Sequence, residues 1–328
     1  MGQMRAGRLV ESGKVECEKA DIRPPGEGDL LVRTTFSSIC GSDLHMVFPK
    51  DPGRMSGPPG FPGHEGVGEV VESKSPDFST GDRVLCVPNA GIGMTFAEYQ
   101  TIPARYCIRL PETDVPELEL LMAQQLGTVI FAQRRRWVDV HGKNVVVIGQ
   151  GSAGIFHAMM CRRYGAAKIV TTDLSPARLA YSRSVVADVA IDANEGVEAV
   201  KEGVRAATNG RGGDYVIEAV GVTETFTQSV ELAAPRADIL WFGLPDSRSE
   251  VPISFSQFFR KQLNAFSAVG AQEEPGLVSF RAALDLIVSG ALDMKPIVSH
   301  TLPIEDVADA FRLAHSRDDG AMKVSVRF

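Results

Sequence analysis

The stretch Asn144-Val-Val-Val-Ile-Gly-Gln-Gly-Ser-Ala-Gly154 decides the fold class, because it joins an apolar run directly to a glycine-rich turn. Residues 145–148 are apolar and β-branched, which is typical of a buried strand. Residues 152–164 have the spacing of a helix. A strand, a G-x-G-x-x-G turn and a helix in this order indicate a dinucleotide-binding unit, with the pyrophosphate at the helix N-terminus. The residues expected to bind it are Gly149, Gly151, Ser152, Ala153 and Gly154.

The next expected strand, residues 168–173, ends on Asp173. A carboxylate at this place accepts hydrogen bonds from the adenosine ribose hydroxyls and repels a 2′-phosphate. Asp173 therefore favours NAD over NADP. The alternative is a glycine-rich turn with a helix-capping aspartate that binds nothing.

Strands and helices continue to alternate for about 125 residues, which predicts right-handed βαβ units and a parallel sheet in an α/β fold. Ser175 is the expected N-cap of one helix, with Pro176 in its first position. The first hundred residues are instead rich in β patterns with glycine and proline between them, and residues 51–63 are expected to form a surface loop. The further expected strands are 187–192, 214–220, 237–243, 264–270 and 322–328, and the further helices are 116–136, 195–208, 276–289 and 304–316.

Composition excludes several classes of protein. The 328 residues are 44% hydrophobic and 23% charged, which are globular proportions. With 34 Lys+Arg against 41 Asp+Glu, the formal charge of −7 gives no general attraction to nucleic acid or to an anionic membrane. No apolar run approaches the roughly 20 residues of a membrane helix. The N-terminus lacks the apolar core of a signal peptide, and five scattered cysteines suit a reducing cytosol, so a cytoplasmic protein is expected.

Two short motifs carry a cysteine, a histidine and a glutamate. Cys40 lies in Cys40-Gly-Ser-Asp-Leu-His45, and His64 and Glu65 lie in Gly63-His-Glu-Gly66. Taken singly, Cys40 is typical of a buried small hydrophobe and His64 of a structural histidine. Together, a thiolate, an imidazole and a carboxylate are ligands that suit zinc. The 24 residues between Cys40 and His64 mean that local spacing does not establish a metal site.

With these motifs, the chain resembles the zinc-dependent alcohol dehydrogenases of the medium-chain dehydrogenase/reductase superfamily over essentially its whole length. Thr172-Asp-Leu-Ser-Pro-Ala-Arg-Leu179 is similar to the sorbitol dehydrogenase branch. The resemblance implies a GroES-like catalytic domain at 1–122 and 271–328 and a Rossmann NAD-binding domain at 123–270. The motifs that carry it are Cys40-Gly-Ser-Asp-Leu-His45, Gly63-His-Glu-Gly-Val-Gly68, Gly81-Asp-Arg-Val84, Gly149-Gln-Gly-Ser-Ala-Gly154 and Gly320-Ala-Met-Lys-Val324.

The resemblance also implies roles for single residues. Cys40, His64 and Glu65 would be ligands of a catalytic zinc. Ser42 and His45 would form a proton relay. The substrate would be a secondary alcohol, such as a polyol, a sugar-like compound or an amino alcohol, or the corresponding ketone. The protein would be a homodimer or homotetramer. The remaining implied contacts are Asp43 with His64, Arg178 with the adenosine, and Val220, Gly221, Gly243 and Leu244 with the nicotinamide half of NAD.

Two departures from the family pattern affect the metal. Residues 81–84 lead to Phe96 with only Cys86 between them, where most zinc members have four closely spaced cysteines. We therefore expect no structural zinc and one catalytic zinc per chain. Gln124 aligns with the last metal ligand of the family, and its amide would contact metal, water or substrate. Cys17, Cys86, Cys107 and Cys161 are then expected to have packing roles.

Two other functions compete with this interpretation. A zinc-free, NADPH-dependent quinone or enoyl reductase of the same superfamily would need no metal ligands, and Cys40, His64 and Glu65 argue against it. A non-catalytic dinucleotide-binding protein would keep the fold and lose the chemistry, and Gln124 is the feature that favours it.

Overall fold

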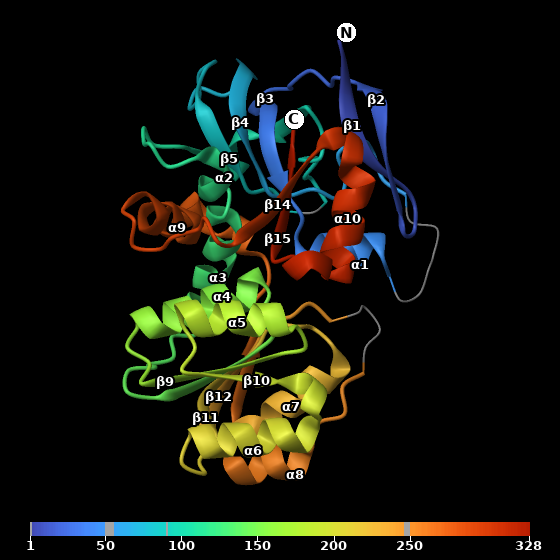
Figure 1. Ribbon diagram of the computed structural model, residues 1–328. Helices are drawn as coiled ribbons and strands as arrows, with labels where there is room; N and C mark the ends of the chain where they lie inside the picture. Colours follow the sequence, from blue (N-terminus) through green and yellow to red (C-terminus); the bar gives the residue numbers. More distant parts are fainter. Residues whose placement is uncertain (1, 50–55, 90, 246–249) are drawn as a thin grey trace. The chain divides into compact units, whose positions relative to one another are not determined.

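The computed structural model describes residues 2–49, 56–89, 91–245 and 250–328 (Figure 1). The chain forms two compact units, one of Met1–Thr128 with Gly270–Phe328 and one of Val129–Val269. The chain passes from the first to the second inside helix α3 (Ala123–Arg135). The expected surface loop 51–63 falls partly on residues 51–55, which lie outside the described residues.

The unit Val129–Val269 is built on a parallel sheet of six strands in the order β10-β9-β8-β11-β12-β13. This arrangement confirms the α/β fold expected from the sequence. The strands are β8 (Asn144–Ile148), β9 (Lys168–Asp173), β10 (Val189–Asp192), β11 (Gly213–Glu218), β12 (Ala233–Trp241) and β13 (Asn264–Ser267). The helices are α4 (Ser152–Arg163), α5 (Pro176–Val185), α6 (Val197–Ala207), α7 (Thr223–Leu232) and α8 (Phe255–Lys261), with the 3-10 turn η2 (Ala193–Glu195).

Sequence patterns predicted most of these elements and missed some. As expected, the Ser175 side chain caps α5 by accepting a hydrogen bond from Arg178 N. The strand expected at 237–243 starts at Ala233 instead. Helices α7 and α8 were not expected. In α8 no residue is buried, so the helix lacks the apolar stripe that periodicity detects.

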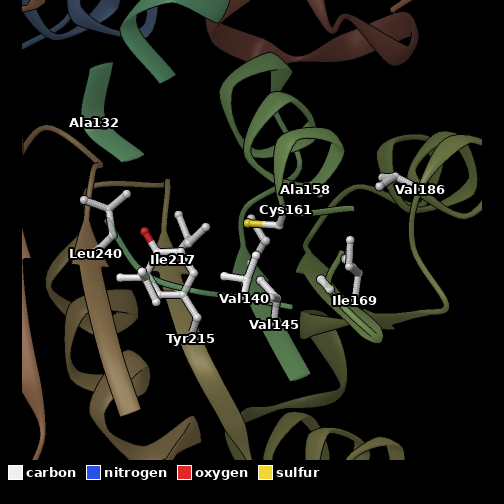
Figure 2. Packing of buried hydrophobic residues seen from close by; sticks show 13 residues of the cluster. Ala132, Val140, Val145, Ala158, Cys161, Ile169, Val186, Tyr215, Ile217 and Leu240 are labelled. Atoms are coloured by element: carbon white, nitrogen blue, oxygen red, sulfur yellow. The ribbon is translucent and has the colours of Figure 1, made fainter. Parts of the chain in front are cut away.

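Both faces of this sheet are buried, and β8 shows how. Val145 and Val147 contribute to one hydrophobic cluster, while Val146 and Ile148 contribute to another on the opposite face. Figure 2 shows the first cluster, where the Cys161 sulfur of α4 lies among aliphatic side chains. In Figure 1, α4 and α5 cover one face and α6, α7 and α8 cover the other. Helices on both faces explain why these strands are continuous apolar runs.

A histidine is buried in the same unit. His157 in α4 is fully buried, and its Nδ1 lies 3.1 Å from Gln133 Nε2. Its ring meets the Phe242 ring edge-on at 4.5 Å. Burial lowers the pKa of His157 from 6.5 to about 3, so the folded protein holds the ring neutral.

We expect His157 to make folding stability depend on pH. The unfolded chain takes up a proton near pH 6.5 and the folded chain near pH 3, so protonation favours unfolding between these values. The free energy of unfolding therefore falls as pH drops through 6.5, by about 2 kcal/mol at pH 5. Urea denaturation at pH 7 and pH 5 should show a loss that is about 2 kcal/mol larger in the unmodified protein than in His157→Gln. The exposed control His141→Gln should keep the full loss, and an unchanged profile in His157→Gln would contradict the assignment.

The other unit contains a sheet of seven strands and a separate β1–β2 hairpin. The path of the sheet is β14-β15-β3-β4-β5-β7, and β6 pairs with β3. The strands are β1 (Gln3–Glu11), β2 (Lys14–Asp21), β3 (Asp29–Ser38), β4 (Gly66–Ser73), β5 (Arg83–Cys86), β6 (Tyr99–Pro103), β7 (Cys107–Arg109), β14 (Val298–Pro303) and β15 (Lys323–Arg327). The helices are α1 (Gly41–Val47), α2 (Glu117–Leu120), the first part of α3, α9 (Val278–Val288) and α10 (Val307–Ser316). The 3-10 turns are η1 (Ala104–Tyr106), η3 (Ala271–Glu273), η4 (Pro275–Leu277), η5 (Ile304–Asp306) and η6 (Asp318–Gly320).

The cysteines outside the candidate metal site lie in packed regions. Cys86 and Cys107 pair across β5 and β7 and are buried, as is Cys161 in α4. Cys17 in β2 is partly buried. All are free thiols. None of the helices in the described ranges combines the length and apolar composition that a membrane span needs.

Candidate active site

The register of β3 and β4 brings together the two motifs that carry the candidate metal ligands. The strands are antiparallel, and Ser37 pairs with Gly66. Cys40 follows the end of β3, and His64 and Glu65 directly precede β4. The sulfur, imidazole and carboxylate ligand atoms of these three residues all lie within 4.8 Å of one another. Two segments that are distant in sequence therefore form one cluster at the same end of the sheet.

Asp43 orients the imidazole of His64. Asp43 Oδ1 lies 2.9 Å from His64 Nδ1, and Asp43 Oδ2 accepts a hydrogen bond from Cys40 N at 2.8 Å. The side chains of Asp43 and His64 are both buried. Burial alone would lower the pKa of His64. The nearby Asp43 carboxylate and, to a smaller extent, Cys40 have the opposite and larger effect, so the pKa of His64 lies well above its ordinary value. With Nδ1 directed to Asp43, Nε2 is the ring atom left for a metal.

Glu65 has one oxygen in an ion pair and one without a partner. Oε2 lies 2.6 Å from Lys323 Nζ and also accepts a hydrogen bond from the Ser38 hydroxyl. Oε1 is buried and has no hydrogen-bond partner among the described residues. Burial alone would raise the pKa of Glu65, but Lys323 and then His64 lower it below its ordinary value. The carboxylate is therefore an anion at neutral pH, with one oxygen available.

A zinc ion fits this donor set. A thiol, an imidazole nitrogen and a carboxylate oxygen are three ligands, and catalytic zinc sites use three protein ligands with an open fourth position. The unpartnered Oε1 of Glu65 would be satisfied by a metal. His64 and Glu65 are 5% and 1% exposed, whereas Cys40 is partly exposed, so the cluster remains open on one side.

Two polar side chains, Ser42 and Gln124, contact His64, and His45 lies on the same helix as Ser42. Ser42 Oγ lies 3.2 Å from His64 Nε2. His45 is three residues further along α1, and residues at this spacing share a helix face. Gln124, at the start of α3, is buried and donates a hydrogen bond from Nε2 to His64 O at 3.4 Å. Its amide nitrogen therefore supports the backbone of His64.

Lys323 is a further residue at the cluster that sequence patterns did not single out, although it lies in the motif 320–324. Lys323 is 2% exposed, and it lies in β15, which pairs with β3. The Glu65 carboxylate outweighs the effect of burial and raises the pKa of Lys323 above its ordinary value. A lysine between apolar residues of a strand was the available signal, but its partner could not be identified from the sequence.

Replacing Lys323 with Met is expected to destabilise the metal-free protein by about 3–5 kcal/mol, because the buried Glu65 charge would lose its partner. Bound zinc supplies positive charge beside Glu65, so the loss should be smaller in the zinc-loaded protein. Urea denaturation of both forms measures the two values, with Lys323→Arg as the control that retains the charge. Equal losses with and without zinc would show that Lys323 does not act through the Glu65 charge.

The glycine-rich turn in the other unit has the geometry of a phosphate site. Gly149 has φ +90°, and a Cβ on Gly154 would lie 1.9 Å from Gly149 O, so these two glycines are required by the turn itself. A Cβ on Gly151 would come no closer than 3.7 Å to a described protein atom, the Nη1 of Arg178. The space beside Gly151 is therefore open to a ligand. Gly151 is the N-cap of α4, and Ser152 and Ala153 form its first turn.

Asp173 connects this turn to the end of β9. Its Oδ2 accepts a hydrogen bond from Gln150 N at 2.6 Å, and its Oδ1 accepts one from Ser175 N at 2.8 Å. The side chain is only partly buried, so its oxygens retain capacity for ribose hydroxyls. Arg178, in the first turn of α5, is 9% exposed.

The residues expected at the nicotinamide half lie on two adjacent segments. Val220 and Gly221 follow β11, and Gly243 and Leu244 follow β12. A Cβ on Gly221 would lie 2.5 Å from Leu244 O, so the two segments touch through their backbones. Leu244 is 44% exposed. Together with Gly149 and Asp173, these residues lie at the carboxyl ends of the parallel strands, which is where such sheets bind ligands.

Comparisons with known proteins agree with this architecture. Residues 26–112 match the family model of the alcohol dehydrogenase GroES-like domain, and residues 153–289 match that of the zinc-binding dehydrogenases. The chain is 28% identical to an L-threonine 3-dehydrogenase from Shewanella frigidimarina over 322 residues, which cover 90% of this chain and 91% of the relative.

Solved structures show the same fold. An alcohol dehydrogenase, TADH from Thermus sp. ATN1, is 27% identical with a TM-score of 0.84, and the match covers 99% of both chains. A protein described as a zinc-binding dehydrogenase from Sinorhizobium meliloti 1021, bound to NADP, is 24% identical with a TM-score of 0.86 over 100% of both chains. The second similarity shows the fold alone.

The fold and the family models define a two-domain oxidoreductase with a GroES-like domain and a Rossmann-type parallel sheet. The chain belongs to the zinc-type alcohol dehydrogenase family of the medium-chain dehydrogenases/reductases. The family expected from the sequence motifs is therefore confirmed.

Proposed function

We propose that this protein is an NAD-dependent dehydrogenase that oxidises a secondary hydroxyl of a polyol, a sugar-like compound or an amino alcohol to the ketone. It would use one zinc per chain, held by Cys40, His64 and Glu65. The observation that carries this proposal is the convergence of these three ligand types within 4.8 Å, beside Ser42. A zinc-free reductase of the same superfamily has no use for such a cluster.

The chemistry divides between the bound groups and the side chains. Zinc at this site supplies Lewis acidity toward an alcohol oxygen, and NAD supplies the hydride acceptor. Cys40 and Glu65 contribute negative charge, while Asp43 fixes the tautomer of His64. The oxidation is balanced: the alcohol loses a hydride and a proton, and the proton is the part that the protein must remove.

We assign to Ser42 the removal of the proton from the substrate hydroxyl. Its Oγ lies 3.2 Å from His64 Nε2, and so next to the group of ligand atoms. The hydroxyl can accept the proton of a substrate alcohol while it donates its own. His45 is partly exposed on the same face of α1 and is the next acceptor toward solvent.

A panel of secondary alcohols, monitored at the NADH absorbance, tests the function. It should contain polyols, sugar alcohols and amino alcohols, and the Shewanella relative makes L-threonine the first amino alcohol to include. We expect zinc-dependent formation of NADH and a ketone with at least one of these classes. Tight NADH binding with no turnover on any class would instead support the non-catalytic dinucleotide-binding protein.

The choice of nicotinamide cofactor is part of the proposal and rests on Asp173. Its carboxylate is fixed between the glycine-rich turn and α5 by two backbone hydrogen bonds. A fixed anion at this place repels a 2′-phosphate. Arg178, near Gly151, is the nearby cation that would favour the phosphate, and the Sinorhizobium structure shows NADP bound to this fold.

We expect kcat/KM with NAD to exceed that with NADP by at least about tenfold, which corresponds to about 1.4 kcal/mol. Asp173→Ser should narrow this ratio, because the repulsion is removed while a hydroxyl remains. Steady-state kinetics with both cofactors measure the ratio, and Arg178→Ala, which should widen it, is the matched control. Equal or better kinetics with NADP in the unmodified protein would contradict the assignment.

A further inference from the structure

Glu218 is a buried acid outside the candidate metal site. It is the last residue of β11, a central strand of the parallel sheet, and its side chain is 0% exposed. A carboxylate in a protein interior requires hydrogen-bond partners. Oε1 accepts three hydrogen bonds, from Val220 N at 2.8 Å, Gly221 N at 2.9 Å and Thr225 Oγ1 at 2.8 Å. The side chain therefore fixes the segment that leads from β11 into α7.

The same residue also fixes the segment after β12. The backbone oxygen of Glu218 accepts hydrogen bonds from Phe242 N at 2.9 Å and Gly243 N at 3.0 Å. A single residue thus bonds to both segments on which Val220, Gly221, Gly243 and Leu244 lie.

No side chain can be placed between the two segments. A Cβ on Gly243 would lie 2.2 Å from Gly221 N and 2.5 Å from Glu218 Oε2. Gly221 has φ +90°, a conformation that favours glycine. Oε2 is buried at this junction and has no hydrogen-bond partner among the described residues. The carboxylate is therefore part of the packing between the segments and is not accessible to a ligand.

We propose that Glu218 is a positioning residue for the nicotinamide half of the cofactor. Its side chain holds the backbone of 220–221, and its backbone oxygen holds that of 242–243, in the arrangement that receives the nicotinamide ring, and it does not touch the adenosine half. This inference rests on the proposed NAD-dependent function. Without the Glu218 side chain, the segment 219–225 would have to be ordered when the cofactor binds, and ordering backbone residues costs conformational entropy.

Binding measurements with two ligands distinguish positioning of the nicotinamide half from a general structural role of Glu218. NADH contains the nicotinamide ring, whereas ADP-ribose contains only the part that binds at the glycine-rich turn and Asp173. In Glu218→Ala we expect the Kd of NADH to rise at least tenfold and the Kd of ADP-ribose to change less than twofold. Glu218→Gln keeps an oxygen acceptor for the three donors, so its NADH affinity should stay within threefold of the unmodified protein.

Hydrogen exchange of the protein without ligand provides a second readout. In Glu218→Ala, residues 219–225 should exchange faster, while residues 149–154 should be unchanged, and so should the amides of Phe242 and Gly243, which bond to the backbone oxygen of residue 218. Thr225→Val removes one of the three donors and should weaken NADH binding about threefold, which keeps the proposal testable should Glu218→Ala not fold.

Equal weakening of NADH and ADP-ribose, or unchanged NADH affinity in a folded Glu218→Ala or Thr225→Val protein, would overturn the proposal. Failure of the unmodified protein to bind either ligand would instead reject the NAD-dependent function itself.

Discussion

Cys40→Ala and His64→Ala are each expected to lose bound zinc and at least about 10³-fold of alcohol oxidation. A Lewis-acid metal contributes several kcal/mol of transition-state stabilisation, and each 1.36 kcal/mol corresponds to a factor of ten in rate. Each variant would leave two protein ligands where a catalytic zinc needs three. Metal analysis and steady-state kinetics measure the two losses. NADH binding should persist, because the glycine-rich turn is built from other residues.

Gln124→Ala is the matched control for these two variants. Gln124 is buried beside the cluster, but the hydrogen bond that it makes there is to His64 O. The thiolate of Cys40 and the carboxylate of Glu65 would together neutralise the two positive charges of a zinc ion. The charges of Asp43 and Lys323 nearby are opposite and cancel each other, so no anionic ligand is needed at position 124. Gln124→Ala should therefore keep most of its zinc, although substrate binding can change. Full activity in a zinc-free Cys40→Ala protein would refute the assigned ligands.

Ser42→Ala is expected to lower turnover by about 10²–10⁴-fold, the usual cost of removing a positioned acid–base group. NADH affinity and zinc content should be unchanged, because Ser42 lies next to the ligand atoms and is not one of the three ligands. The measurement is single-turnover oxidation with a deuterated alcohol, which shows whether hydride transfer limits the rate.

His45 provides the comparison for Ser42. It is partly exposed, so solvent or buffer can replace it, and His45→Ala should lose less activity and recover part of it in imidazole buffer. An unchanged rate in Ser42→Ala, with hydride transfer shown to limit turnover, would eliminate the relay.

The parallel-sheet unit could be predicted from the sequence because its signals are local. A buried parallel strand is a continuous apolar run, and β8 is followed at once by the turn that needs Gly149 and Gly154. Helix α8 escaped prediction because Phe255 and Phe259 point outward and are 74% and 71% exposed. The start of β12 at Ala233 was missed because Pro235 and Arg236 interrupt its apolar pattern, and Arg236 has φ +65°.

The cluster of candidate metal ligands was expected from family resemblance, because its assembly depends on pairing between distant strands. Cys40 and His64 meet only through the register of β3 with β4. Lys323 and Glu218 were missed for a related reason. Nearly all of β15 is buried, so inward and outward residues do not alternate there, and the partner of Lys323 is far away in sequence. The hydrogen-bond partners of Glu218 are close in sequence. Its burial, however, results from the position of β11 between β8 and β12, which the sequence alone does not show.

The most direct test of the zinc-dependent mechanism is the zinc content per chain, measured together with alcohol oxidation before chelation, after it, and after zinc is restored. We expect about one zinc per chain in the purified protein, loss of activity in step with loss of zinc, and recovery when zinc is returned. Two zincs per chain would show that a structural site exists in addition. Full activity in a rigorously metal-free preparation would contradict the mechanism and favour the zinc-free reductase.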